Sequence, residues 1–163
     1  MLQNKKTMVL LTVLIAVSCS SVNSENATAP PLMSHENCPC NFENKLTDWQ
    51  VLQMAIAMTE SRFNPNAEGS SSDIGIFQIR PIYATEAARV SKIPFQHHDA
   101  WDIEKSIQMF NVVQDYHNPD HDILRAISLH NKARWYSARV LENMEFIRKM
   151  ELVRQNILDY ELR

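Results

Sequence analysis

Two short segments of this 163-residue chain, AMTESRFNPNA at residues 57–67 and DIGIFQIRP at residues 73–81, decide its fold. In the first segment Glu60 stands at the end of an apolar helical stripe, and Pro65 cannot continue the helix, so the helix is expected to end before this proline. The chain contains only two glycines, one within the second segment (Gly75) and one between the segments. Because glycine is so scarce, we expect it where the backbone has a special conformation.

The composition is that of one globular domain with a helical preference. Hydrophobic residues make up 45% and charged residues 21% of the chain, which is the balance of a folded protein. The formal net charge of −3 provides no basic field for nucleic acid, so nucleic acid is not expected as a partner. The scarcity of glycine favours helix over sheet.

The first residues have the features of an export signal. Lys5 and Lys6 precede an apolar run at residues 8–17 that is too short for a membrane span, so residues 1–18 are interpreted as a signal peptide. The sequence Ala-Val-Ser-Cys that follows fits a signal-peptidase site and also resembles a lipobox, with Cys19 as the lipidated residue. We therefore predict an exported, periplasmic protein, anchored to the membrane as a lipoprotein through Cys19.

Residues 19–41 are interpreted as a disordered tether because they are rich in Ser, Asn and Pro and lack apolar periodicity. Residues 42–163 then form the folded domain. Within the tether, Cys38 and Cys40 are separated by one residue, so a bond between them would close a strained ring. A free pair and an intermolecular link are the alternatives.

The folded domain is predicted to be all-α. Thr47 and Gln50 form a capping box at the start of the first helix, which is expected to point Glu60 close to its buried face. Later helices are expected over about residues 82–90, from Asp99 or Asp102, from Asp120 or Asp122, and over about residues 137–160. The buried stripe of the last helix is predicted to be Val140, Met144, Ile147, Met150, Val153 and Ile157. Residues 75–79 fit a turn, a strand or the start of a helix, and no convincing pair of strands is visible.

Glu60 is the candidate catalytic residue. General acid catalysis at neutral pH needs a group that still holds its proton, and a carboxyl among apolar side chains is suited to that role. The alternative is an exposed glutamate at a helix end, because charged side chains are mostly exposed.

Three ordered motifs resemble those of the soluble lytic transglycosylases, which are related to goose-type lysozyme. The motifs are Glu60-Ser61 followed by Phe63-Asn64-Pro65-Asn66-Ala67, then Gly75-Ile76-Phe77-Gln78, and then a degraded Ser128-Leu129-His130-Asn131-Lys132-Ala133 with Tyr136 at a similar spacing. The second motif resembles most closely the variant of conjugation-associated and phage-type members. The resemblance implies a single lysozyme-like domain that acts on the glycan strands of peptidoglycan.

By this resemblance, Glu60 protonates the oxygen that links N-acetylmuramic acid to N-acetylglucosamine and then accepts a proton from the muramic 6-hydroxyl. The product is a 1,6-anhydro ring. The substrate-binding residues implied are Ser61, Gly75, Phe77, Gln78, His130, Asn131 and Tyr136. Histidine stands at position 130 where the family has an aromatic hydroxyl, and a protonated His130 would favour the ionised form of Glu60.

Two alternative functions and one possible partner remain open. Asp73 is a possible second carboxylate, which could activate water and make the protein a hydrolytic muramidase, although it could equally cap a turn. The degraded third motif also fits a catalytically weak, peptidoglycan-binding envelope lipoprotein. A tethered domain of either kind could serve an envelope-spanning secretion or conjugation apparatus.

No cofactor and no metal are predicted. His117, His121 and Asp122 form a loose candidate cluster, but Pro119 interrupts the helical spacing that would aim both rings at one ion.

Overall fold

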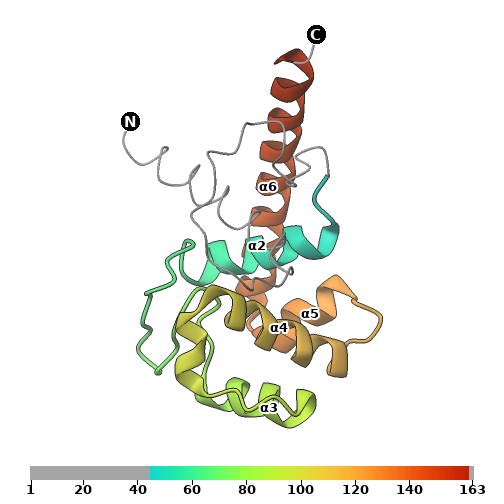
Figure 1. Ribbon diagram of the computed structural model, residues 1–163. Helices are drawn as coiled ribbons and strands as arrows, with labels where there is room; N and C mark the ends of the chain where they lie inside the picture. The colour runs from blue at the N-terminus through green and yellow to red at the C-terminus, as the bar shows by residue number, and fades with distance from the viewer. Residues whose placement is uncertain (1–44, 162–163) are drawn as a thin grey trace, which may run out of the picture. The chain divides into compact units, whose positions relative to one another are not determined.

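The computed structural model describes residues 45–161, which form an arrangement of helices joined by one long loop and several short ones (Figure 1). The elements are α2 (Asp48–Glu60), α3 (Pro81–Ser91), the 3-10 helix η2 (His97–Trp101), α4 (Ile103–His117), α5 (Ile123–His130) and α6 (Arg134–Glu161). The predicted signal peptide, the tether, Cys19 and the Cys38–Cys40 pair lie outside the described residues. No helix within 45–161 combines the length and the apolar character needed to cross a membrane.

Helix α2 is the central element, and its start is the capping box predicted from the sequence. The Gln50 amide donates to Thr47 Oγ1 over 3.2 Å, and the Thr47 amide donates to Gln50 Oε1 over 2.9 Å. Most of the apolar residues of α2 are fully buried, and the helix packs against both α6 and α5. Because α2 is pinned along its length, its last residue, Glu60, has a defined position at the edge of the core.

The loop between α2 and α3 is held by buried apolar side chains and by one close backbone contact. Ile74, Ile76 and Phe77 are buried, and isolated bridges pair Glu68 with Ile74 and Ile74 with Ile79. Residues 75–79 therefore form a turn, which was one of the three predicted possibilities.

Gly75 has a positive φ of +77°, and a Cβ at this residue would lie 1.8 Å from the Ala100 carbonyl oxygen. Glycine is thus required here both by the conformation of the backbone and by the space available.

Both later helices for which an aspartate cap was predicted begin at one of the two candidates named for each. Asp102 accepts from the Lys105 amide and caps α4, while Asp122 accepts from the Arg125 amide and caps α5. Asp99 instead belongs to η2, where its carboxylate accepts from the Gln96 amide. The prediction of an all-α domain is confirmed, because the described residues contain no strand longer than an isolated bridge.

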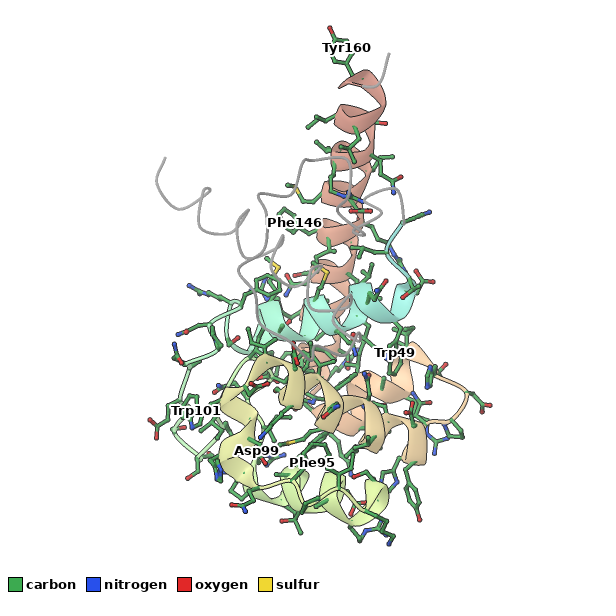
Figure 2. The ribbon with its side chains drawn as sticks, in the orientation of Figure 1. Trp49, Phe95, Asp99, Trp101, Phe146 and Tyr160 are labelled. Atoms are coloured by element: carbon green, nitrogen blue, oxygen red, sulfur yellow. The ribbon has the colours of Figure 1, made fainter. Side chains whose placement is uncertain are left out.

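The predicted stripe of α6 is only partly buried. Val140, Met144 and Ile147 lie in the core, but Met150, Val153 and Ile157 are exposed, so this half of the prediction was wrong. The C-terminal half of α6 extends beyond α2, and several apolar side chains there are exposed (Figures 1 and 2). Helical periodicity indicates an apolar stripe, but it does not indicate whether another element covers it.

Candidate active site

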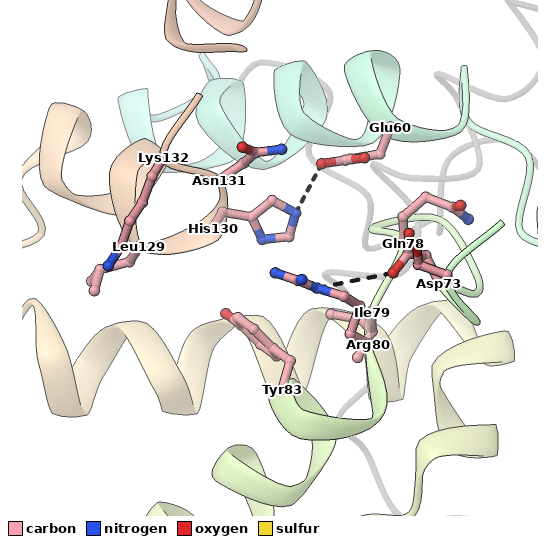
Figure 3. A pocket seen from close by; sticks show the side chains of 11 residues that line it. Glu60, Asp73, Gln78, Ile79, Arg80, Tyr83, Leu129, His130, Asn131 and Lys132 are labelled. Carbon is pink, nitrogen blue, oxygen red and sulfur yellow. Dashed lines mark ion pairs between the residues drawn. The ribbon is translucent and has the colours of Figure 1, made fainter. Parts of the chain in front are cut away.

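A cavity of about 400 Å³ opens where the end of α2, the loop before α3 and the end of α5 meet (Figure 3). Its walls are formed by Glu60, Ser71, Asp73, Gln78, Ile79, Arg80, Tyr83, Leu129, His130, Asn131 and Lys132. The cavity is of the size that holds a small ligand or part of a larger one. Two carboxylates, two permanent cations and an imidazole share its surface.

Glu60 and His130 face each other at the centre of this site. Each is the last residue of its helix, and Glu60 Oε1 lies 3.2 Å from His130 Nε2. The Glu60 side chain is 19% exposed and that of His130 only 5%, so the carboxylate is accessible from the cavity while the imidazole is set into the wall. The two groups make an ion pair whenever His130 carries a second proton.

Aromatic rings hold the His130 ring from three sides. The ring centroids of Tyr83, Tyr136 and Phe110 lie 5.9, 6.0 and 6.1 Å from that of His130, and the Tyr136 ring is stacked on it. This packing leaves the imidazole little freedom to turn away from Glu60.

Unpartnered polar atoms gather around the same pair. Among the described residues, the buried side-chain atoms that lack a hydrogen bond are Asp73 Oδ1, Tyr83 Oη, Ser106 Oγ, His130 Nδ1 and Tyr136 Oη. All of these except Ser106 belong to the cavity wall or stack on it. Buried polar atoms in native proteins almost always have a partner, so this cluster indicates a place for polar groups of a ligand or for bound water.

Both tyrosine hydroxyls are kept neutral by their surroundings. Burial raises the pKa of Tyr83 and outweighs the opposite influence of the neighbouring Gln114 side chain. Burial also raises the pKa of Tyr136, and the nearby Glu60 carboxylate raises it further. Gln114 and Glu60 lie near these hydroxyls, but neither completes a hydrogen bond of acceptable geometry with them. The hydroxyls therefore remain available as donors.

The opposite wall of the cavity is built from the loop. Asp73 Oδ1 lies 3.9 Å from Arg80 Nε, in an ion pair that is open to solvent on the arginine side. Gln78 donates from Nε2 to the carbonyl oxygens of Ala67 (3.0 Å) and Gly75 (2.9 Å), which fixes its side chain against the loop backbone. The backbone of Gln78 has a positive φ of 48°, a conformation that is unfavourable for a residue with a side chain.

The structure brings five of the predicted site residues together on the cavity wall, namely Glu60, Asp73, Gln78, His130 and Asn131. The other four predicted residues, Ser61, Gly75, Phe77 and Tyr136, do not line it. Ser61 Oγ donates to the Ile76 carbonyl over 2.8 Å and so ties the end of α2 to the loop. Phe77 is buried against Phe110, and Tyr136 is buried beneath His130, so both support the site from behind.

Sequence reasoning did not place Arg80, Tyr83 and Lys132 in the site. Arg80 is the N-cap residue of α3, and Tyr83 follows within its first turn, so both enter the cavity because α3 begins at the motif that contains Gln78. Lys132 enters from the loop that follows α5. The signal that could have found Tyr83 is its position two residues beyond a proline that starts a helix.

The histidines of the metal cluster considered in the sequence have other partners. His117 Nε2 lies 2.6 Å from Glu86 Oε1, while His121 Nε2 lies 2.8 Å from Asp115 Oδ1 and its ring stacks on Trp49. Within residues 45–161 no group of three or more His, Cys, Asp or Glu side chains has the arrangement of a metal site.

Comparison with known proteins adds one match. Residues 38–118 match the model of a family described as transglycosylase SLT domain, whereas no curated protein and no solved structure matches the chain. The matched range includes Glu60, Asp73 and Gln78 and ends before α5, so His130 and Lys132 lie outside it. The match covers slightly less than half of the chain, and together with the all-α fold it shows that this part of the chain is similar to the transglycosylase SLT domain, a family whose members are peptidoglycan lytic transglycosylases.

Proposed function

We propose that this protein is a lytic transglycosylase that cleaves the β-1,4 bond between N-acetylmuramic acid and N-acetylglucosamine in peptidoglycan, with Glu60 as general acid and base. The observation that carries the proposal is the position of Glu60. It lies at the end of α2 on the wall of a 400 Å³ cavity, within the range that matches the family.

In the first step, Glu60 donates its proton to the glycosidic oxygen, and the bond from this oxygen to C1 of the muramic residue breaks. In the second step, the muramic 6-hydroxyl loses its proton to the Glu60 carboxylate, and its oxygen bonds to C1. The proton count balances, because the proton given to the leaving group is replaced by the proton from the 6-hydroxyl. Water is not consumed, so a single carboxyl group is sufficient.

His130 is proposed to hold Glu60 between the two steps. After Glu60 has given up its proton, a neutral His130 can donate from Nε2 to the carboxylate across the 3.2 Å contact and keep it oriented. If His130 instead takes the proton from Glu60, the pair becomes an imidazolium and a carboxylate, and the acid is lost. The proton therefore has to reside on Glu60 when the glycan binds.

A hydrolytic muramidase is the second candidate, because Asp73 faces the same cavity and its Oδ1 has no hydrogen-bond partner among the described residues. In an inverting hydrolase, a second carboxylate activates a water molecule that attacks C1. The Arg80 guanidinium, whose Nε lies 3.9 Å from Asp73 Oδ1, would hold this carboxylate at the cavity wall.

A weak or inactive glycan-binding protein is the third candidate. It is motivated by His130 and Lys132, which stand where the family motif has an aromatic hydroxyl and a small residue.

The deciding experiment is mass spectrometry of the fragments that the protein releases from purified peptidoglycan. We expect 1,6-anhydro products from the wild type. The rate of their release is expected to fall at least about 100-fold in Glu60→Gln, because the general acid is removed. Glu68→Gln is the matched control, since Glu68 is an exposed carboxylate of the loop that follows α2 and does not line the cavity. Reducing-end products that depend on Asp73 would establish the hydrolase instead. Binding of peptidoglycan without any cleavage would support the binding protein.

We further propose that the protein is exported to the periplasm and anchored there through a lipidated Cys19, close to an envelope-spanning secretion or conjugation apparatus. Export and anchoring are supported by the apolar N-terminal run and by the Ala-Val-Ser-Cys sequence, whereas the apparatus is inferred from the resemblance of the second motif to conjugation-associated members. Metabolic labelling with palmitate tests the anchor, because the label is expected in the wild type and should be lost in Cys19→Ser. Equal labelling of both proteins would contradict the anchor.

A further inference from the structure

The C-terminal half of α6 carries a row of exposed apolar side chains. Phe146, Met150, Val153, Ile157 and Tyr160, named here the α6 seam, are between 41% and 83% exposed. Figure 2 labels the first and the last of them along the part of α6 that extends beyond α2. Single exposed apolar residues are ordinary on protein surfaces, but a continuous row of five indicates an interaction surface.

The spacing of the α6 seam is that of a coiled coil. Successive members are four, three, four and three residues apart, which is the alternation of two apolar positions in a heptad repeat. The residues that α6 buries in the domain, such as Tyr136, Val140 and Met144, lie about 100° further round the helix, at about 100° per residue. The α6 seam is therefore a second apolar stripe beside the buried one, and its period fits a partner helix.

Two ion pairs within α6 lie just before the α6 seam and along its first turns. Lys149 Nζ lies 2.7 Å from Glu145 Oε1, and Arg139 Nη1 lies 3.3 Å from Glu142 Oε2. Because acidic and basic groups alternate along this face, it does not require a strongly charged partner. An anionic lipid surface is disfavoured for the same reason. Two identical copies could approach each other without net repulsion.

The exposed area is also large enough for a pair of copies. The five side chains leave roughly 500 Å² uncovered, so two seams would bury about 1,000 Å² together, which is the lower limit for specific interfaces. Because α6 is already helical along the seam, association would not have to pay for the formation of the helix.

We propose that the protein forms a homodimer in which the α6 seams of two copies pack side by side. This inference is independent of the proposed enzymatic activity, since the α6 seam contains no residue of the cavity wall. Because the interface is small, the dissociation constant is expected to be micromolar or weaker.

Sedimentation equilibrium of the full chain under reducing conditions tests the proposal, and the reducing agent excludes links through cysteine. We expect a monomer–dimer equilibrium that Val153→Glu and Ile157→Glu each weaken by tenfold or more, because a buried carboxylate opposes packing of the seam. Leu152→Glu is the matched control, since Leu152 is an equally exposed apolar residue of α6 outside the α6 seam. Circular dichroism shows whether each variant retains its helices.

Two outcomes would overturn the proposal. One is a monomer at every concentration. Alkylation of a cysteine introduced by Ile157→Cys then tests whether residues 1–44 of the same chain cover the α6 seam, since a covered cysteine is protected. The other is a dimer that Val153→Glu and Ile157→Glu do not weaken more than Leu152→Glu does.

Discussion

Replacement of Gly75 by alanine tests whether the turn beside the cavity has the geometry described above. At φ +77° an alanine lies in the left-handed region, which costs about 1–2 kcal/mol for a residue with a Cβ. The added Cβ would also lie 1.8 Å from the Ala100 carbonyl oxygen, so the backbone of the loop or of η2 has to move. Overpacking of this kind costs about 1–3 kcal/mol, which brings the expected loss of unfolding free energy to about 2–5 kcal/mol.

Thermal unfolding followed by circular dichroism measures this loss. For a domain of this size, a loss of about 2–5 kcal/mol lowers the midpoint temperature by roughly 10–20 °C. The Gln78 side chain bonds to the Gly75 carbonyl oxygen, so the same variant is also expected to lose activity when the turn shifts.

Gly69→Ala is the matched control, because Gly69 is the other glycine of the chain. Its added Cβ would meet the Gln78 Oε1 atom at 2.8 Å and the Asp73 Cβ atom at 3.1 Å, which are longer contacts than the one at Gly75, and Gly69 does not have a positive φ. We expect this control to lower the midpoint by only a few degrees. If Gly75→Ala unfolds within about 3 °C of the wild type, or no earlier than Gly69→Ala, the argument from backbone conformation and close contact is wrong.

Four further predictions concern single side chains. Ser61→Ala removes the hydrogen bond to the Ile76 carbonyl and is expected to cost about 1–2 kcal/mol of unfolding free energy, measurable by urea denaturation; no change would mean that water replaces the hydroxyl. Tyr83→Phe removes a buried hydroxyl without a hydrogen bond, so we expect unchanged or higher stability together with a raised KM for glycan; an unchanged KM would remove this hydroxyl from substrate binding. Hydrogen bonds from Arg89 and, to a smaller extent, His117 lower the pKa of Glu86 to about 2. The contribution of Glu86 to stability is therefore present above the ordinary carboxyl pKa of about 4.5 and is lost as the pH falls towards 2. Glu86→Gln is therefore expected to flatten the acid side of the stability curve between these values, and an unchanged curve would contradict the pairing. His130→Tyr restores the hydroxyl that the family motif carries next to Glu60, and we expect retained cleavage of peptidoglycan; loss of cleavage would show that a phenol cannot replace the imidazole that contacts Glu60.

Local sequence signals were sufficient to predict the all-α fold and most helix ends. The caps at Thr47, Asp102 and Asp122 depend on side chains within three residues of the backbone groups that they bond, so short motifs report them directly. Because glycine is scarce in this chain, the sequence also indicated that Gly75 has a special role. The close contact that excludes a side chain there is with the Ala100 carbonyl, which lies 25 residues further along and could not be predicted from the sequence.

The candidate site was predicted only in part. The sequence indicated Glu60 as the acid and His130 as an unusual neighbour, but Tyr83, Arg80 and Lys132 entered the site through the packing of α3 and α5. Ser61 and Tyr136 were expected to contact substrate, whereas the structure gives one a tie to the loop and the other a place beneath His130. Side chains that belong to one motif need not face the same way.

By itself, the sequence determined the helical class of the domain, the start of α2 and the carboxylate at its end, because these depend on neighbours within one or two helical turns. The resemblance suggested that Glu60 and His130, 70 positions apart, are neighbours, but only the tertiary structure gave their direct contact of 3.2 Å. It also decided that α6 buries one apolar stripe but leaves the α6 seam exposed. Both outcomes depend on which helices pack against each other. The pattern of a single helix shows which of its faces is apolar, whereas the packing of the whole domain determines what covers that face.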